Sequence, residues 1–408
     1  MGILKNGKRF LKPIIIGTLS LTLLFGGGMA LSYVSDEVVF ENYADNQEQD
    51  EMVKLLDCQD VYRDKWGYRL KHNDTQPIYV SISDDFTQAQ REEVVKALDY
   101  IFGIVGEIND NYRYEIVEKD FKFAKTSIHF RIKGDGDYEG IHKQNFNSFM
   151  SLLGGHGMMS YNHTISIDPQ FLETQQKRTY SVCVHELLHC FGIDDVYSAK
   201  NKPYVSNTFV NVNVENKGVE MLTPNDMKLL CAMYHKPFAN NEERDAFVQQ
   251  VLEKVDAYSV EFYTHHDKAF QEYYQKIYEE KGYPQTTIDR LNMHLPIQNG
   301  KFTFYQISNS QKIGSIELVL DDSGYTVTTF DHNQNQLDSC SGKAYMVNNA
   351  VYLQNVNLDP LLSDANSYVD LCLYLQADGK YVLKDLTDSA VFYGTNLKLE
   401  LDLSDEKE

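Results

Sequence analysis

The chain has 408 residues, enough for two globular domains that each bury a core of their own. Its composition, with 42% hydrophobic and 12% aromatic residues, is that of a folded protein and excludes disordered and collagen-like chains. Lys and Arg total 38 against 59 Asp and Glu, and the net charge of -21 repels phosphate backbones. We therefore expect no nucleic-acid partner.

The N-terminal segment, residues 1–34, is predicted to export the chain. Four Lys and Arg side chains precede an uncharged apolar run from Ile14 to Val34. This pattern is typical of a signal peptide, and the run is also close to the length that spans a bilayer, so a cleaved signal peptide and an uncleaved membrane anchor remain alternatives. Both place the rest of the chain outside the cell, secreted or held on the outer face of the membrane through this segment alone.

Residues 35–76 are acidic and polar without lasting periodicity, which indicates a stalk or a propeptide. The six cysteines of the chain are scattered and none forms a CxxC pair, so no disulfide framework is predicted. We expect Cys183 and Cys190, seven residues apart on one helix face, to be small buried hydrophobes. A bridge between Cys340 and Cys372 is left open.

Regular elements begin at Pro77. Strands are expected at 78–83, 112–118 and 127–133, and a helix from Thr87 to Gly106, which together predict a mixed sheet with a helix on one face. MMSY and HTISID are read as two short strands around a turn at Asn162. A second helix follows from about Tyr180 to Cys190.

The later part of the chain is predicted to form three regions. A helix at 222–234 has Thr223 as N-cap, Pro224 at its first position and Asp226 at its third, and it closes a domain that runs from 77 to 239. Residues 240–294 are expected to form a helical connector. Residues 295–408 show strands with hairpin turns at Ser323-Gly324, Asn348-Asn349 and Asp378-Gly379, typical of an antiparallel all-β domain. The fold class is therefore α+β followed by an all-β domain.

The stretch VCVHELLHCFGIDD carries the strongest chemical signal. His185 and His189 stand four residues apart, so on a helix both imidazoles project from one face and can reach one ion. Glu186 sits beside that position, where it can receive a proton from metal-bound water. Gly192 can turn the helix end through a positive φ, which lets Asp195 return to the metal as a third ligand.

HELLHCFGIDD resembles the extended metzincin motif HExxHxxGxxH, with Asp in place of the last His as in the snapalysin-like proteases. The resemblance covers residues 77 to 234. It implies that His185, His189 and Asp195 are zinc ligands and that Glu186 is the general base and later proton donor. It also implies a cleft-lining edge strand, which we expect at Met158–Asn162.

Several alternatives stay open within this interpretation. Asp194 can replace Asp195, and in gluzincin-type enzymes the third ligand is a later Glu, for which Glu215 and Glu220 are the candidates. Met221 is either the methionine of the turn beneath the metal or an ordinary core residue. A further hypothesis holds that a thiolate of Cys58 occupies the open zinc position and keeps the protein latent.

Two weaker signals precede the helix. Asp135, Asp137 and Glu139 lie among glycines in GDGDYEG, a pattern that fits a calcium site and equally a solvated acidic turn. His156 and His163 flank the expected edge strand and are read as polar surface residues, with contact to substrate or to a second metal as the alternative.

The sequence thus predicts an exported metzincin-like zinc endopeptidase that hydrolyses protein or peptide substrates, with Zn²⁺ as its cofactor. The alternative from another class is a non-catalytic surface protein that keeps a zinc-binding helix for binding or structure. Because a purely structural site has no need of Glu186 beside the water, the sequence favours the enzyme.

Overall fold

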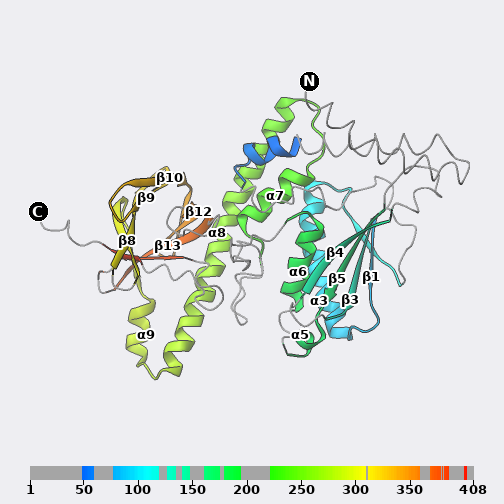
Figure 1. Cartoon of the computed structure of the whole chain (residues 1–408), viewed down its shortest axis with the longest axis horizontal. Coiled ribbons are helices and arrows are strands. Elements are labelled where there is room, and N and C mark those ends of the chain that lie inside the picture. The colour runs from blue at the N-terminus through cyan, green and yellow to red at the C-terminus, as the bar shows by residue number, and fades with distance from the viewer. Residues whose placement is uncertain are drawn as a thin grey trace, which may run out of the picture. The chain divides into compact units, whose positions relative to one another are not determined.

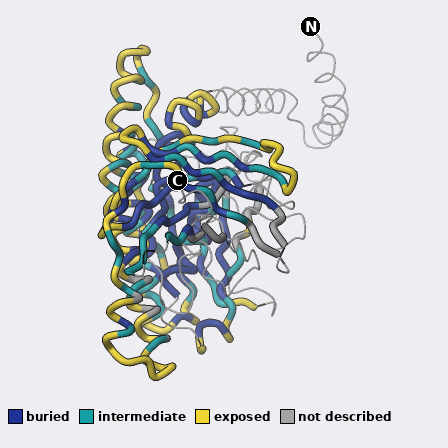
Figure 2. Tube along the Cα trace, turned by 90° about the vertical axis from the view of Figure 1, so that its left-hand side faces the viewer, coloured by how far each residue is buried: buried dark blue, intermediate teal, exposed yellow. Residues whose placement is uncertain are grey.

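The computed structural model describes residues 48–58, 77–118, 126–134, 140–147, 160–174, 179–193, 221–308, 311–358, 368–377, 379, 381–385 and 399–401. These residues form a mixed α/β structure with one mixed sheet and two antiparallel sheets (Figure 1). They divide into two compact units, and the chain passes from one to the other several times, once inside a helix, between His185 and Glu186. The exposed positions concentrate on helices and turns, while the strands are mostly buried or half-buried (Figure 2).

The first unit contains a five-stranded sheet with the order β2-β1-β3-β5-β4. Four strands run parallel and β4 runs antiparallel to β5 at one edge. The predicted mixed sheet and its first three strands are confirmed. The strands are β1 (Ile78–Ile82), β2 (Tyr114–Ile116), β3 (Thr126–Ile132), β4 (Gly140–Asn147) and β5 (Ser160–Ile167).

Helix α3 (Gln88–Ile108) covers the apolar face of this sheet, as its periodicity predicted. Thr87 caps it through a capping box with Gln90, which satisfies backbone N–H groups at the first turn. The ring centroid of Phe102 on α3 lies 5.0 Å from that of Tyr114 on β2. The opposite face of the sheet is polar: Ser81 bonds His129, Ser127 donates to Asn162 and Arg131 donates to Ser166 across neighbouring strands.

The turn expected at Asn162 is wrong, and residues 160–162 of the expected edge strand lie inside the sheet, while Met158 and Met159 are outside the described residues. β5 runs through Asn162 without a break, and this residue pairs with Ser127 of β3 on one side and Asn145 of β4 on the other. β5 is therefore an interior strand and β4 is the edge. The sequence of β4, GIHKQNFN, has too few apolar residues to show the alternation by which a half-buried strand is recognised.

Four helices follow the sheet in chain order: α5 (Pro169–Thr174), α6 (Thr179–Cys190), α7 (Pro224–Tyr234) and α8 (Asn241–Glu280). α7 and α8 belong to the second unit. α7 begins as predicted, with Thr223 as N-cap and Asp226 completing a capping box. Every residue of α7 is buried. α8 is a single helix of 40 residues, followed by the short α9 (Gln285–Asn292).

Two antiparallel sheets, of order β10-β9-β8-β7-β15 and β11-β12-β13-β14, confirm the predicted all-β region. Asn348 and Asn349 take φ values of 48° and 67°, as a tight hairpin turn requires. The β8 to β9 turn falls at 322–323, one residue before the expected position. The strands are β6 (His294–Leu295), β7 (Gly300–Ser308), β8 (Gln311–Asp321), β9 (Gly324–Asp331), β10 (Gln336–Gly342), β11 (Ala344–Val347), β12 (Ala350–Asn357), β13 (Tyr368–Gln376), β14 (Tyr381–Asp385) and β15 (Leu399–Leu401).

Two hydrophobic clusters hold the second unit together. The larger lies between the two sheets and includes the fully buried Phe304, Ile316 and Leu353. The smaller joins α8 to the sheet that contains β12, through Tyr263 of α8 and Tyr352 of β12, whose rings stack at 4.8 Å. α8 is thus packed along part of its length against the sheet. Cys340 and Cys372 are free thiols, so the bridge left open between them does not form.

Buried carboxylates reinforce the contact between α8 and the sheet. Asp267 of α8 accepts hydrogen bonds from Tyr352 at 2.8 Å and from Asn348 at 3.0 Å. Asp370 of β13 accepts one from Tyr263 of α8 at 2.8 Å. Since each buried oxygen here has a donor, the polar groups fix the register of helix on sheet instead of weakening the core.

Asp370 is expected to make the stability of the second unit depend on pH. It is 5% exposed, and burial raises its pKa from 3.8 to about 6, against the lowering effect of its hydrogen bonds from Asn355 and Tyr263. The neutral form is thus favoured in the folded state. The protonated Asp370 side chain therefore stabilises the folded state. This stabilisation is fully present below the pKa that Asp370 has in the unfolded chain, and it is lost as the pH rises through about 6. The loss in the free energy of unfolding is at most about 3 kcal/mol.

Urea unfolding between pH 4 and pH 8 tests this expectation. The free energy of unfolding of the wild type minus that of Asp370→Asn should fall as the pH rises across this range. The charge of Asp370 raises the pKa of Tyr263, Tyr325 and Tyr345, and these three tyrosines stay neutral at these pH values, so they add no titration of their own. A difference that does not change with pH would contradict the expectation.

Candidate functional site

Helix α6 presents its two histidines on the less buried of its faces. His185 and His189 are half-buried, whereas Val184, Leu187 and Leu188 between and beside them are buried. Since residues four apart on a helix lie one above the other, both imidazoles share one face, as the spacing predicted. This face is accessible enough to receive a ligand, and the apolar face fixes the helix.

Glu186 lies next to the histidine face and is 4% exposed. Its backbone carbonyl accepts a hydrogen bond from the thiol of Cys190 at 3.5 Å. Burial and the charge of Glu186 raise the pKa of Cys190 well above its ordinary value, so this thiol stays protonated. Cys190 is therefore a buried apolar residue, as predicted with Cys183, and does not compete as a thiolate ligand.

Gly192 ends the helix in the predicted way. Its φ of +80° lies in the left-handed region that favours glycine, and its N–H donates to the carbonyl of His189 at 3.0 Å. Phe191 anchors this end by packing edge-on against Phe102 of α3, with ring centroids 5.3 Å apart. The helix therefore ends just before Gly192, which stands two residues before the first of the two aspartates in the sequence.

The proposed third ligands lie outside the described residues. This holds for Asp195, for its neighbour Asp194 and for Glu215 and Glu220. Within the described ranges, no group of three or more His, Cys, Asp or Glu side chains gathers around one point. The described donors, two imidazoles with a carboxylate beside them, fit a zinc site that takes its third ligand from the chain after Gly192.

A buried carboxylate lies near His185, and the sequence did not mark it as functional. Asp226, at the first turn of α7, is 1% exposed. Its pKa is raised to about 7 by burial, while hydrogen bonds from Thr223 and the charge of His185 act in the opposite direction. The only signal in the sequence was the capping box, which accounts for an acidic residue at this position without any role in a site.

Other predicted residues come out differently or stay untested. Met221 packs against the cluster of α8 and the β-sheet, which favours the ordinary core residue over the methionine of a turn beneath a metal. His163 is fully buried in β5, in register with Ile128 of β3, so its assignment to the surface is wrong. Residues 135–139 of the acidic glycine-rich turn and His156 lie outside the described part of the chain.

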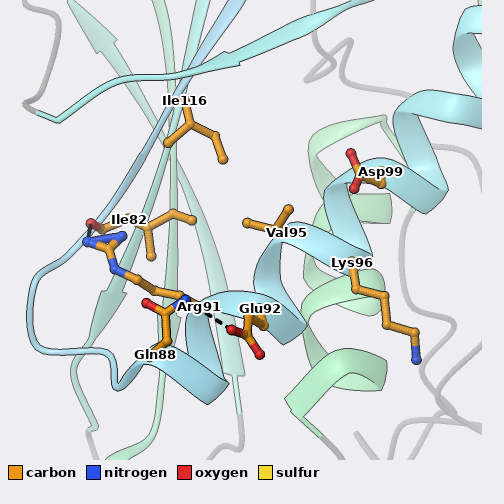
Figure 3. Close-up of a pocket in the computed structure, with 8 residues that line it drawn as sticks. All are labelled: Ile82, Gln88, Arg91, Glu92, Val95, Lys96, Asp99 and Ile116. Carbon is orange, nitrogen blue, oxygen red and sulfur yellow. Dashed lines mark hydrogen bonds between the residues drawn. The ribbon is translucent and has the colours of Figure 1, made fainter.

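Two surface hollows occur away from the histidine helix. One of about 430 Å³ lies beside α3, with Ile82, Val95 and Ile116 at its apolar centre, and Arg91 crosses its rim to donate to the carbonyl of Ile82 at 3.0 Å (Figure 3). Another, of about 490 Å³, is lined by residues of α8 and the β-sheets, including the ion pair of Asp256 and Lys343. Neither contains the combination of nucleophile, base and ligands that a catalytic site needs.

Comparison of the chain with protein-family models, curated proteins and solved structures found no match. The functional argument therefore rests on the residues of the site. The expected signal peptide or anchor lies outside the described residues, and in the part of the chain that is described no helix is both long and apolar enough to cross a bilayer.

Proposed function

We propose that the chain is an exported zinc-dependent endopeptidase of metzincin-like design. The observation that carries this proposal is the geometry of α6, where two half-buried histidines share a face, Glu186 lies beside them, and Gly192, three residues before Asp195 in the sequence, ends the helix with a φ of +80°. A helix that served only the core would not need the histidine pair on the less buried of its faces.

The roles of the residues follow from this arrangement. A zinc ion at this site, when bound, supplies a water of lowered pKa and a Lewis acid for the scissile carbonyl. His185, His189 and Asp195 hold the ion, and the carboxylate of Glu186 takes the proton of the water and returns it to the leaving amine. The substrate is a protein or peptide.

An extended peptide needs a partner for its backbone. Among the described strands of the first unit, β4 is the edge of the sheet and pairs only with β5, so its other side can offer backbone N–H and C=O groups to an added strand. β4 and the C-terminal half of α6 belong to the same compact unit. The substrate-binding edge expected at Met158–Asn162 is thus reassigned to β4.

Metal analysis tests the proposal. The full chain, purified without chelators, should contain about one zinc per molecule by mass spectrometry. Asp195→Ala should lose most of this zinc because the site falls to two protein ligands, whereas the matched control Asp194→Ala should keep it. The absence of zinc from all three proteins would reject the metal site, and zinc loss in the control alone would move the third ligand to Asp194.

A further inference from the structure

Three neighbouring strands of the first unit contain no acidic residue. β3, β5 and β4 stand next to one another in the sheet, and none of their residues is Asp or Glu, although the chain carries 59 Asp and Glu and a net charge of -21. Asp168 directly follows β5, but its carboxylate accepts the backbone N–H groups of Gln170 and Phe171 at the start of α5. The acidic turn at residues 135–139 precedes β4 and lies outside the described residues. Within the three strands, every charged side chain is therefore basic.

The register of these strands places the basic side chains on one side of the sheet. Lys143 of β4 pairs with Thr164 of β5, and Thr164 pairs with His129 of β3. Register partners on adjacent strands point to the same side, so all three belong to the polar side, opposite the side that α3 covers. Arg131 of β3 lies on this side as well, since its Nε donates to the hydroxyl of Ser166 at 3.0 Å. Lys143 is exposed, and it stands on β4, the edge of the described sheet.

Ile141 accompanies Lys143 on this side of β4. It precedes Lys143 by two residues, pairs with Ser166 and is half-buried. β4 therefore offers an apolar side chain and an exposed ammonium group about 7 Å apart along the strand. The carboxylate of Glu115 on β2 shares this side, but three strands, or about 19 Å, separate β2 from β4. Among the described strand residues, no carboxylate therefore neighbours Lys143.

We propose that Lys143 is a specificity-determining residue of the peptide-binding edge: the substrates carry an acidic side chain opposite Lys143 and an apolar side chain two residues away, opposite Ile141. Side chains directly opposite one another on paired strands have Cβ atoms about 4.5–5.5 Å apart, close enough for an ion pair. The substrate residues on either side of the acidic one point to the α3 side of the sheet, so Lys143 does not select them. The inference rests on the proposed function, because it takes β4 as the edge to which the substrate strand is added.

Matched peptides measure this preference. A peptide that the full chain cleaves is taken from a library, and each position around the cleaved bond is replaced in turn by Glu and by Gln, which have the same shape and differ in charge. In the wild type, kcat/KM of the Glu peptide should exceed that of its Gln twin by about 2- to 5-fold at one position, the range expected of an exposed ion pair, and should be nearly equal to it at the two neighbouring positions.

Substitutions of Lys143 assign the preference to this side chain. In Lys143→Glu the preference for Glu at that position should reverse, and in Lys143→Gln it should disappear. Lys96→Glu is the matched control, since Lys96 is an exposed lysine of α3, the helix on the other side of the sheet, and this variant should keep the wild-type preference.

The outcomes distinguish this inference from the proposed function. If the wild type cleaves none of the peptides, the proposed function fails and the inference fails with it. If the wild type and Lys143→Glu cleave with the same ratio of Glu to Gln at every position, the inference alone is overturned. A reversal confined to one position, which shrinks as the salt concentration rises, supports a direct ion pair with Lys143. Thermal unfolding shows whether the variants keep the fold, and Lys143→Gln carries the comparison if Lys143→Glu is unfolded.

Discussion

Replacing Glu186 by Gln should reduce peptide-bond hydrolysis by about 10²- to 10⁴-fold, the contribution typical of a positioned general base. Gln has the shape of Glu but cannot accept the proton of the attacking water or return it to the leaving amine. Because the carboxylate lies beside the histidine face and is not one of the proposed ligands, zinc content should remain that of the wild type. Loss of rate without loss of metal is the signature of a catalytic base.

The rate is measured on unfolded protein substrates and peptide libraries, with zinc content determined on the same samples. Glu92→Gln is the matched control, since Glu92 is an exposed carboxylate of α3 on the rim of the surface hollow in Figure 3 and takes no part in the proposed chemistry. Equal rates in the wild type and Glu186→Gln would reject the proposed role of Glu186. Zinc binding without any cleavage in the wild type would support the non-catalytic alternative.

The elements that the sequence predicted well are those whose side chains alternate between buried and exposed sides. α3 shows a helical stripe that includes Val94, Leu98 and Ile101, and all three are fully buried. β4 and β10 were missed because their sequences are mostly polar, so burial left no periodic trace. The wrong edge strand came from the metzincin resemblance, which implies an edge strand before the active-site helix, and because β4 had been missed, no other strand was available to take that place.

The sequence predicted the site residues that lie close together along the chain, and it did not predict a residue that only the tertiary fold brings to the site. His185, Glu186, His189 and Gly192 lie within eight residues, and helix geometry alone relates them. Asp226 comes from another helix, and only folding brings it near His185. In the sequence, the capping box with Thr223 already accounts for an acidic residue at position 226, so nothing indicated that the carboxyl group of Asp226 is buried.

α8 illustrates the same limit on a larger scale. Its sequence reads as an amphipathic helix that links two regions, and nothing local shows that Tyr263 and Asp267 face a sheet more than 80 residues further along the chain. In the structure, Tyr263 is fully buried, stacks on Tyr352 and donates to Asp370. The region expected to serve as a connector is therefore part of the packing of the second unit.

Replacing Tyr263 by Ala should lower the free energy of unfolding by about 3–5 kcal/mol, the usual cost of removing a large buried aromatic side chain. The substitution opens a cavity beside Tyr352 and leaves the buried carboxylate of Asp370 without its hydroxyl donor. Tyr263→Phe keeps the ring and loses only the hydrogen bond, so it should cost about 1–3 kcal/mol. The difference between the two variants reports the packing of α8 on the sheet.

Urea unfolding followed by circular dichroism measures both variants, with Tyr283→Ala as the control. Tyr283 is 46% exposed, and its ring lies 5.7 Å from that of Tyr278, so its loss should change stability far less. If Tyr263→Ala unfolds at the midpoint of the wild type, α8 is a linker that only touches the sheet. If it unfolds earlier in one cooperative step that includes the strands, then α8 and the β-sheets fold as one structure, and the accessory β region cannot be removed without loss of the helix that holds Leu222 and the start of α7.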